Sequence, residues 1–278
     1  MSPLDPTRAS LAYKDENFID SDDARPLRIL AEYLQPLHAF ARENIRDTIV
    51  FFGSARIRPD GPLGRYYDAA RDVARLVTEW SISLPTHARR YVVCTGGGPG
   101  IMEAANRGAY DAGGRTIGLN IGLPHEQLPN PFITHELSFE FHYFFMRKLW
   151  FASLARALVV FPGGFGTLDE LCEILTLAQT GKIARRIPVI LYGSDYWNEV
   201  INFPALVKHG TISATDLELF TFTDDPQHAF ELLQRGILEA EREEKLETLP
   251  RIDAVEESEH QNRDECAPNF AHSHTPDE

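Results

Sequence analysis

The sequence predicts an α/β fold with a doubly wound, mostly parallel sheet and helices on both faces. Two observations lead to this prediction. Short runs rich in β-branched and aromatic residues alternate with segments of helical periodicity. The runs are apolar at nearly every position, which is typical of strands buried on both faces. The predicted strands are 48–52, 91–94, 116–119, 157–161 and 188–192, with a shorter one at 219–222.

Helices are expected before and between these strands. The first has apolar residues at helical spacing on one side, and Pro36 should kink or split it because proline removes a backbone hydrogen bond. The apolar side of this helix comprises Leu27, Leu30, Leu34, Leu37 and Phe40. The predicted helices are 24–45, 64–80, 100–112, 141–155, 168–181, 195–208 and 226–247.

Composition divides the chain into three parts. Residues 1–23 are polar and read as a disordered segment. Residues 24–248 form a single predicted domain, with 24–45 as a helical extension at its start. Residues 249–278 are acidic and proline-containing, and we expect a disordered tail.

Charge and cysteine content exclude several classes of protein. The net charge of −14 argues against a nucleic-acid partner. Much of this charge is local, since there are 13 acidic and 4 basic residues from Glu239 onward, so an anionic small substrate stays possible. No apolar run approaches the ~20 residues of a membrane span, and the N-terminus lacks the pattern of a signal peptide. The three cysteines, Cys94, Cys172 and Cys266, are too dispersed for a disulfide framework or a zinc site. We expect a cytoplasmic protein with no metal site and no membrane contact.

Three of the predicted strands end in loops of glycine and small polar residues: 53–56, 95–100 and 162–167. In a Rossmann-like sheet, ligands bind beyond the carboxyl ends of the strands, so the three loops should rim one crevice. Each loop alone is weak evidence, since tight turns require glycine with or without a ligand. The second loop contains no G-x-G-x-x-G, and the next strand ends without an acidic residue, which disfavours NAD. A mononucleotide fits better, and no cofactor is expected.

The third loop runs directly into a predicted helix. Backbone N–H groups at such a junction favour an anion, and Glu170 would lie one turn inside the helix. Two interpretations of Glu170 stay open on spacing alone. Thr167 and Glu170 have the Thr-x-x-Glu spacing of a capping box, in which Glu170 would serve only the backbone. Alternatively, Glu170 is a catalytic carboxylate. Asp169 is expected to complement the helix dipole.

Arg147 lies in the aromatic-rich segment 139–151 and also has two interpretations. It could be a surface arginine whose stem covers apolar neighbours. It could instead be a planar fork that clamps a phosphate, a ribose or a carboxylate.

Taken together, Met146-Arg147-Lys148 and the later Pro-Gly-Gly-x-Gly-Thr-x-x-Glu at 162–170 resemble the Lonely Guy (LOG) family, whose members are often described as lysine decarboxylases. The 96–102 and 53–54 segments also match, so the resemblance covers about residues 46–235. The family's usual histidine two residues before the arginine is replaced by Phe145. Pyridoxal-dependent decarboxylation needs a lysine for the Schiff base. Of the chain's five lysines, Lys14 and Lys245 lie outside the predicted core, and the other three have no recognisable pyridoxal-site context.

The resemblance implies a cytokinin-activating hydrolase that cleaves the N-glycosidic bond of nucleoside 5′-monophosphates, AMP and N6-prenylated AMP among them, to free base and ribose 5-phosphate. It also implies a homodimer or higher homo-oligomer. The aromatic-rich segment 139–151 could contribute to that interface, or its aromatic residues could instead fill the core. The alternative is a nucleotide- or cofactor-binding protein without hydrolysis, similar to molybdenum-cofactor carriers. The implied catalytic pair is Arg147 and Glu170; the phosphate loop is Gly163, Gly164, Phe165, Gly166 and Thr167; the other nucleotide-binding residues are Gly53, Ser54, Gly97, Gly98, Met146 and Lys148.

Overall fold

The computed structural model describes residues 11–122, 128–183 and 185–247. Its centre is a seven-stranded sheet in which every neighbouring pair is parallel. The predicted α/β class with a parallel sheet is therefore confirmed. The strands are β1 (Thr48–Phe52), β2 (Val92–Thr95), β3 (Thr116–Ile121), β4 (Ser138–Phe141), β5 (Ala155–Val160), β6 (Val189–Tyr192) and β7 (Thr221–Thr223), in the spatial order β4-β3-β2-β1-β5-β6-β7.

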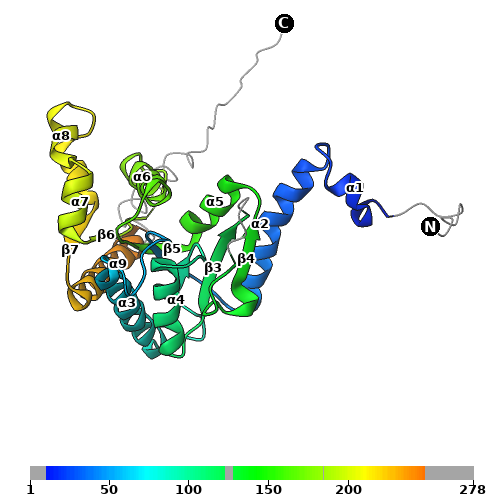
Figure 1. The fold of residues 1–278 in the computed structure, drawn as a ribbon, viewed down its shortest axis with the longest axis horizontal. Helices are drawn as coiled ribbons and strands as arrows, with labels where there is room; N and C mark the ends of the chain where they lie inside the picture. The colour runs from blue at the N-terminus through cyan, green and yellow to red at the C-terminus, as the bar shows by residue number, and fades with distance from the viewer. Residues whose placement is uncertain (1–10, 123–127, 184, 248–278) are drawn as a thin grey trace, which may run out of the picture. The chain divides into compact units, whose positions relative to one another are not determined.

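Helices cover both faces of this sheet (Figure 1). Consecutive strand residues point to opposite faces, so Ile49 and Phe51 of β1 join one core while Val50 and Phe52 join the other. The first core is closed by α3 (Gly64–Ser83), α4 (Ile101–Asp111) and the start of α9 (Pro226–Glu247). The second is closed by α2 (Arg25–Arg42), α5 (Phe144–Leu154), α6 (Phe165–Gln179), α7 (Ser194–Val200) and α8 (Phe203–Lys208).

The strand order reverses direction beside β1. From β1 the chain builds outward through β2, β3 and β4 on one side, and it then returns to place β5, β6 and β7 on the other. Such a switch point leaves a crevice outside the carboxyl ends of the two strands that flank it. The loops that follow β1 and β5 therefore define where a ligand is expected.

Two elements differ from the sequence-based expectation. Strand β4 was not predicted, because four residues of Ser-Phe-Glu-Phe give too short an alternating pattern next to a helical one. The helix predicted over 195–208 is two helices, α7 and α8, separated at Ile201–Asn202. The Asn202 side chain caps α8 by accepting a hydrogen bond from the Ala205 backbone N–H, and Pro204 follows at a position suited to a helix start.

Pro36 does not split α2, which runs unbroken from Arg25 to Arg42. A proline at 36 cannot donate to the carbonyl of Glu32. That carbonyl instead accepts a hydrogen bond from the indole Nε1–H of Trp150 on α5, at 3.1 Å. The Glu32 carboxylate accepts two more, from the backbone N–H groups of His142 and Tyr143. The carbonyl that Pro36 leaves without a partner inside α2 thus helps to attach α2 to α5.

The predicted ends of the domain are described only in part. The segment expected to be disordered contains two short helices, at Ala12–Lys14 and Glu16–Ile19. The predicted tail, 249–278, lies outside the described residues. By internal contacts the chain groups into two units, residues 1–237 and 238–278. Within the described part of the chain, no helix is both long and apolar enough to cross a membrane.

Candidate functional site

The three glycine-containing loops meet at the switch point, held by backbone hydrogen bonds. The N–H of Ser54, after β1, donates to the carbonyl of Pro162, after β5, at 3.0 Å. The N–H of Ile101, at the start of α4, donates to the carbonyl of Ser54 at 3.1 Å. The expectation that these loops rim one crevice is therefore met by direct contact between their backbones.

A buried polar network fixes the second loop. The Thr95 hydroxyl donates to Oδ1 of Asn106, and Asn130 donates to that same oxygen and to the carbonyls of Gly97 and Gly98. Gly97 has a φ of +74°, and a Cβ built on it would lie 2.1 Å from the Asn120 side-chain oxygen. Only glycine therefore permits this turn beside Asn120. Because every member of the network is bonded, the loop is rigid.

Helix α6 begins at Phe165 with no side-chain cap at Gly164. The first N–H groups of a helix have no partner inside it, so this terminus offers donors and a partial positive charge. A Cβ on Gly163 would lie 2.1 Å from Oγ1 of Thr167, and the Gly163 carbonyl accepts a hydrogen bond from the Tyr196 hydroxyl at 2.8 Å. A Cβ on Gly164 or Gly166 would meet nothing within 4 Å. The surface beside the helix start is therefore open.

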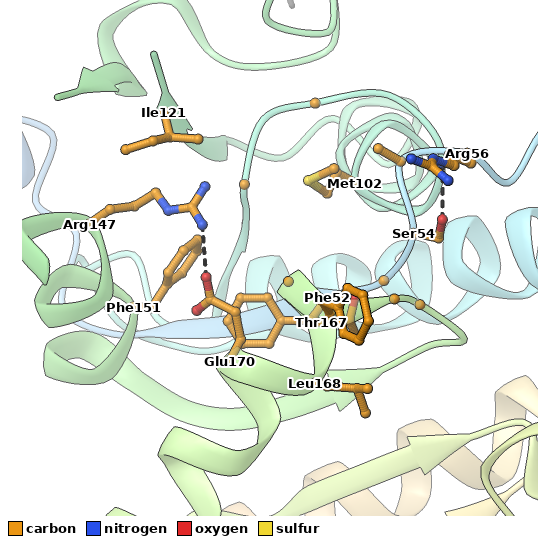
Figure 2. A pocket seen from close by; sticks show the side chains of 18 of the residues that line it. Phe52, Ser54, Arg56, Met102, Ile121, Arg147, Phe151, Thr167, Leu168 and Glu170 are labelled. Atoms are coloured by element: carbon orange, nitrogen blue, oxygen red, sulfur yellow. Dashed lines mark hydrogen bonds and ion pairs between the residues drawn. The ribbon is translucent and has the colours of Figure 1, made fainter. Parts of the chain in front are cut away.

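The capping-box interpretation of Glu170 is wrong. Thr167 lies inside α6, two residues after Phe165, so it cannot be the N-cap. Glu170 reaches across to α5, where its Oε1 accepts a hydrogen bond from Nη2 of Arg147 at 2.8 Å (Figure 2). The two side chains are 14% and 7% exposed. The surface-arginine interpretation of Arg147 is therefore also wrong.

The guanidinium of Arg147 is held by more than its ion pair. Its central carbon lies 5.4 Å from the ring centroid of Phe144 and 5.6 Å from that of Phe151, the geometry of cation–π contacts. Its Nε is buried and has no hydrogen-bond partner within the described part of the chain. The rings fix the orientation of the fork, and part of its hydrogen-bonding capacity is left unused.

Burial raises the pKa of Glu170 above the ordinary glutamate range, while the charges of Arg147 and Lys148 act in the opposite direction. Cys94 of β2 lies near this carboxylate, and burial raises the pKa of its thiol strongly. The thiol is therefore neutral at physiological pH. Glu170 stands out as a buried carboxylate with one strong cationic partner, a combination common at catalytic positions.

Arg147, Glu170 and residues of all three glycine-containing loops line one cavity of about 760 Å³. Figure 2 shows Arg147 and Glu170 on one side of it, with Ser54 and Arg56 across from them. The volume suits a ligand of nucleotide size. Most of the remaining wall is apolar and is formed by Phe52, Met102, Ile121, Phe144, Phe151, Leu168 and Val200.

Most of the predicted site residues share this cavity: Arg147, Glu170, Gly163, Gly164, Phe165, Gly166, Thr167, Gly53, Ser54 and Gly98 all line it. Three predicted nucleotide-binding residues do not appear in its wall. Gly97 lies close against the Asn120 side chain, and Met146 is buried in the core. The Lys148 ammonium forms ion pairs with Asp169 at 2.7 Å and Glu173 at 2.9 Å. Asp169 therefore has a side-chain partner in addition to any interaction with the helix dipole.

Sequence reasoning missed several residues of the wall. Asn120, Ile121 and Tyr196 carry no motif, and only the fold brings them to the site. Arg56 is the last residue of the first predicted loop, but it is not among the residues predicted to bind the nucleotide. Its guanidinium makes no hydrogen bond or ion pair among the described residues. An unengaged cation beside an open helix N-terminus adds to the site's preference for an anion. The described part of the chain contains no cluster of three or more His, Cys, Asp or Glu side chains placed to hold a metal.

A profile of the family described as "possible lysine decarboxylase" matches residues 102–233. The cytokinin riboside 5′-monophosphate phosphoribohydrolase LOG3 of Arabidopsis thaliana is 31% identical over 183 residues, 64% of this chain and 77% of that protein. A probable enzyme of the same name, LOGL3 of Oryza sativa subsp. japonica, is 31% identical over 68% of this chain and 84% of its own length. The solved molybdenum cofactor binding protein of Rippkaea orientalis is 20% identical, with a TM-score of 0.46, over 68% of this chain and 97% of that one. Similarity at that last level does not bear on function.

Proposed function

The chain belongs to the family of cytokinin riboside 5′-monophosphate phosphoribohydrolases, the LOG family, and we propose that it hydrolyses the N-glycosidic bond of nucleoside 5′-monophosphates. AMP and N6-prenylated AMP are the proposed substrates, and free base and ribose 5-phosphate are the products. The observation that carries the proposal is the buried Arg147–Glu170 pair, which shares its cavity with the open N-terminus of α6. A cytoplasmic location belongs to the same proposal.

The 5′-phosphate binds at the start of α6. The N–H groups of Phe165, Gly166 and Thr167 supply donors, and the helix dipole favours the dianion. Arg56 contributes a cation from the facing loop. The absence of side chains at Gly164 and Gly166 lets the phosphate approach the backbone closely. This contact anchors the end of the substrate that does not react.

The ribose then extends along α6 towards Glu170. Glu170 follows Phe165 by five residues, about 7.5 Å along the helix axis, which suits the reach from a bound phosphate to the anomeric carbon. Cleavage of the glycosidic bond develops positive charge on the sugar ring. The Glu170 carboxylate stabilises that charge and accepts a proton from the attacking water. The water oxygen bonds to C1′ and the C1′–N bond breaks. The proton that Glu170 accepted is delivered, in net terms, to the base, and the second proton of the water stays on the oxygen as the new anomeric hydroxyl.

Arg147 orients this carboxylate. Its ion pair keeps Glu170 ionised against the effect of burial, and the Phe144 and Phe151 rings hold the guanidinium in place. A fixed carboxylate does not have to reorganise when the charge develops, and this lowers the barrier. The apolar wall beside the pair, which includes Ile121 and Phe151, receives the base.

Incubation of the purified full-length protein with AMP tests this function. We expect chromatography to detect adenine and ribose 5-phosphate in equal amounts, with adenosine turned over far more slowly because it lacks the anchoring phosphate. Equal turnover of AMP and adenosine would contradict the phosphate site. Tight binding of AMP with no release of adenine would instead support the non-catalytic alternative, a nucleotide-binding protein.

A further inference from the structure

Helix α2 exposes four leucines that nothing in the described chain covers: Leu27, Leu30, Leu34 and Leu37, each between 44% and 50% exposed. At 100° per residue they occupy one arc about 80° wide. The opposite side of α2 is anchored, since Pro36, Ala39 and Phe40 are buried. Contiguous apolar surface on an ordered helix marks an interaction site more often than chance. We call these four residues the leucine seam.

The seam is self-complementary. Its intervals are three, four and three residues, so the spacing is the same in both directions along the helix. If a second α2 is laid antiparallel about residue 32, Leu27 lies opposite Leu37 of the second copy, and Leu30 lies opposite Leu34. This is the a-to-d pairing of an antiparallel coiled coil. A two-fold axis produces such a contact with no further adjustment.

The charges at the two ends of the seam favour the same orientation. Asp22 and Asp23 stand exposed just before α2, and Arg42 and Arg46 stand exposed at its far end. Antiparallel pairing about residue 32 brings Asp22 of one copy level with Arg42 of the other. Parallel pairing would bring like charges together, at a cost.

Two neighbouring charges that would blur this polarity are turned inward. Arg28 donates to the carbonyls of Ile19 and Ser21 and to the Tyr143 hydroxyl. The Glu43 carboxylate is 13% exposed and lies 3.3 Å from Arg115 and 3.6 Å from Arg42, whose own side chain stays 54% exposed. Arg25, at the start of α2, is exposed, and its guanidinium lies over the Tyr143 ring at 5.6 Å. Two exposed acidic residues and one exposed basic residue therefore stand at the beginning of α2, and two exposed basic residues stand at its end.

We propose that the leucine seam is an interface between two copies of this chain, with the two α2 helices antiparallel. The seam covers about 15 Å, from Leu27 to Leu37, of a helix about 27 Å long. A stable interface buries about 800 Å² on each partner, more than four half-exposed leucines supply. The neighbouring helix α5 extends the apolar surface with Phe145, 50% exposed, and Leu149, 40% exposed. Figure 1 shows these two helices together at the β4 edge of the sheet. The inference does not depend on the reaction catalysed.

Light scattering after size-exclusion chromatography of the full chain, over a range of concentrations, tests the seam. We expect the L30E variant to have half the mass of the wild-type assembly, because two buried carboxylates would face leucines across the two-fold axis. The matched control is L206E, which changes a 39%-exposed leucine on α8 and should leave the mass unchanged. An assembly whose mass L30E does not alter, or a wild type that stays a single chain throughout, would overturn the proposal.

A charge-swap variant tests the orientation. In the antiparallel arrangement, the glutamate introduced by L30E lies opposite the lysine introduced by L34K on the other copy. The double variant L30E/L34K should therefore regain the wild-type mass, and raised salt should lower it again. Failure to regain it would overturn the antiparallel pairing. Loss of helical circular dichroism in L30E would show that the leucines pack within one chain, which also overturns the proposal.

Discussion

Helices α5 and α6 are joined by two sets of ion pairs from consecutive residues, and the two sets have opposite environments. Arg147 and Glu170 meet inside the cavity wall, 14% and 7% exposed. Lys148 and Asp169, one residue along each helix, meet outside it, where Asp169 is 58% exposed. Solvent screens the outer pair, so its contribution to stability is small. The side chains of the inner pair are largely buried, so solvent screens their charges much less. The same chemistry one residue apart thus serves attachment in one case and, in our proposal, catalysis in the other.

The largest difference between the two pairs is expected on removal of their carboxylates. E170Q keeps the shape of the side chain but loses the charge that faces the sugar. We expect kcat for AMP to fall by about 10³-fold, within the range for loss of a positioned acid–base group. The matched variant D169N should change kcat by less than about twofold. Steady-state assay of adenine release compares the two, and equal effects would remove the distinction between the inner and outer pairs.

Removal of the two cations should separate the pairs through their pH dependence. Burial already raises the pKa of Glu170, so the acid limb of kcat/KM should lie above the ordinary glutamate range. Arg147 opposes that rise more strongly than Lys148 does. We therefore expect R147M to lower kcat by about 10²-fold and to move the acid limb to higher pH. K148M should move it less. If R147M left the limb in place, Arg147 would not be what keeps Glu170 ionised.

The uncapped start of α6 can be tested by giving it a cap. G164D would place a carboxylate in open space at the N-cap, where it can accept from the same N–H groups as the substrate phosphate. The helix should gain ~0.5 kcal/mol, raising Tm by about 1–2 °C, while KM for AMP rises by more than about tenfold. Differential scanning fluorimetry and kinetics measure the two effects. The neutral variant G164A should raise KM less. A rise in Tm with unchanged KM would place the phosphate elsewhere.

The smallest effect is expected at Arg56, an exposed cation on the facing loop. R56A should raise KM for AMP by about tenfold, the loss expected for one charge-assisted hydrogen bond, and should leave kcat nearly unchanged. Arg58 lines a smaller neighbouring cavity instead of the main one, so R58A is the matched control. Similar changes in both variants would indicate general attraction of the anion to the loop rather than a specific contact.

The sequence predicted the layers of this fold well because buried parallel strands carry an unmistakable apolar run. It missed β4, whose four residues are too few to show a period. The motifs identified Arg147 and Glu170, yet spacing alone left the capping box open. That question depends on where α6 begins, and the helix starts two residues before Thr167. Asn120 and Tyr196 could not be predicted, since each is brought to the cavity by a strand or helix distant in sequence.

Glu32 gives the N-terminal extension a role in the placement of Arg147. Its carbonyl, freed by Pro36, and its carboxylate together bind three donors in and just before α5, the helix that carries Arg147. The motifs that resemble the LOG family lie within about residues 46–235, and Glu32 precedes them. Removal of the residues before this region would leave the Trp150 indole N–H and the backbone N–H groups of His142 and Tyr143 without these acceptors. Arg147, the proposed orienting residue of the site, would then stand on a helix that has lost its three hydrogen bonds to α2.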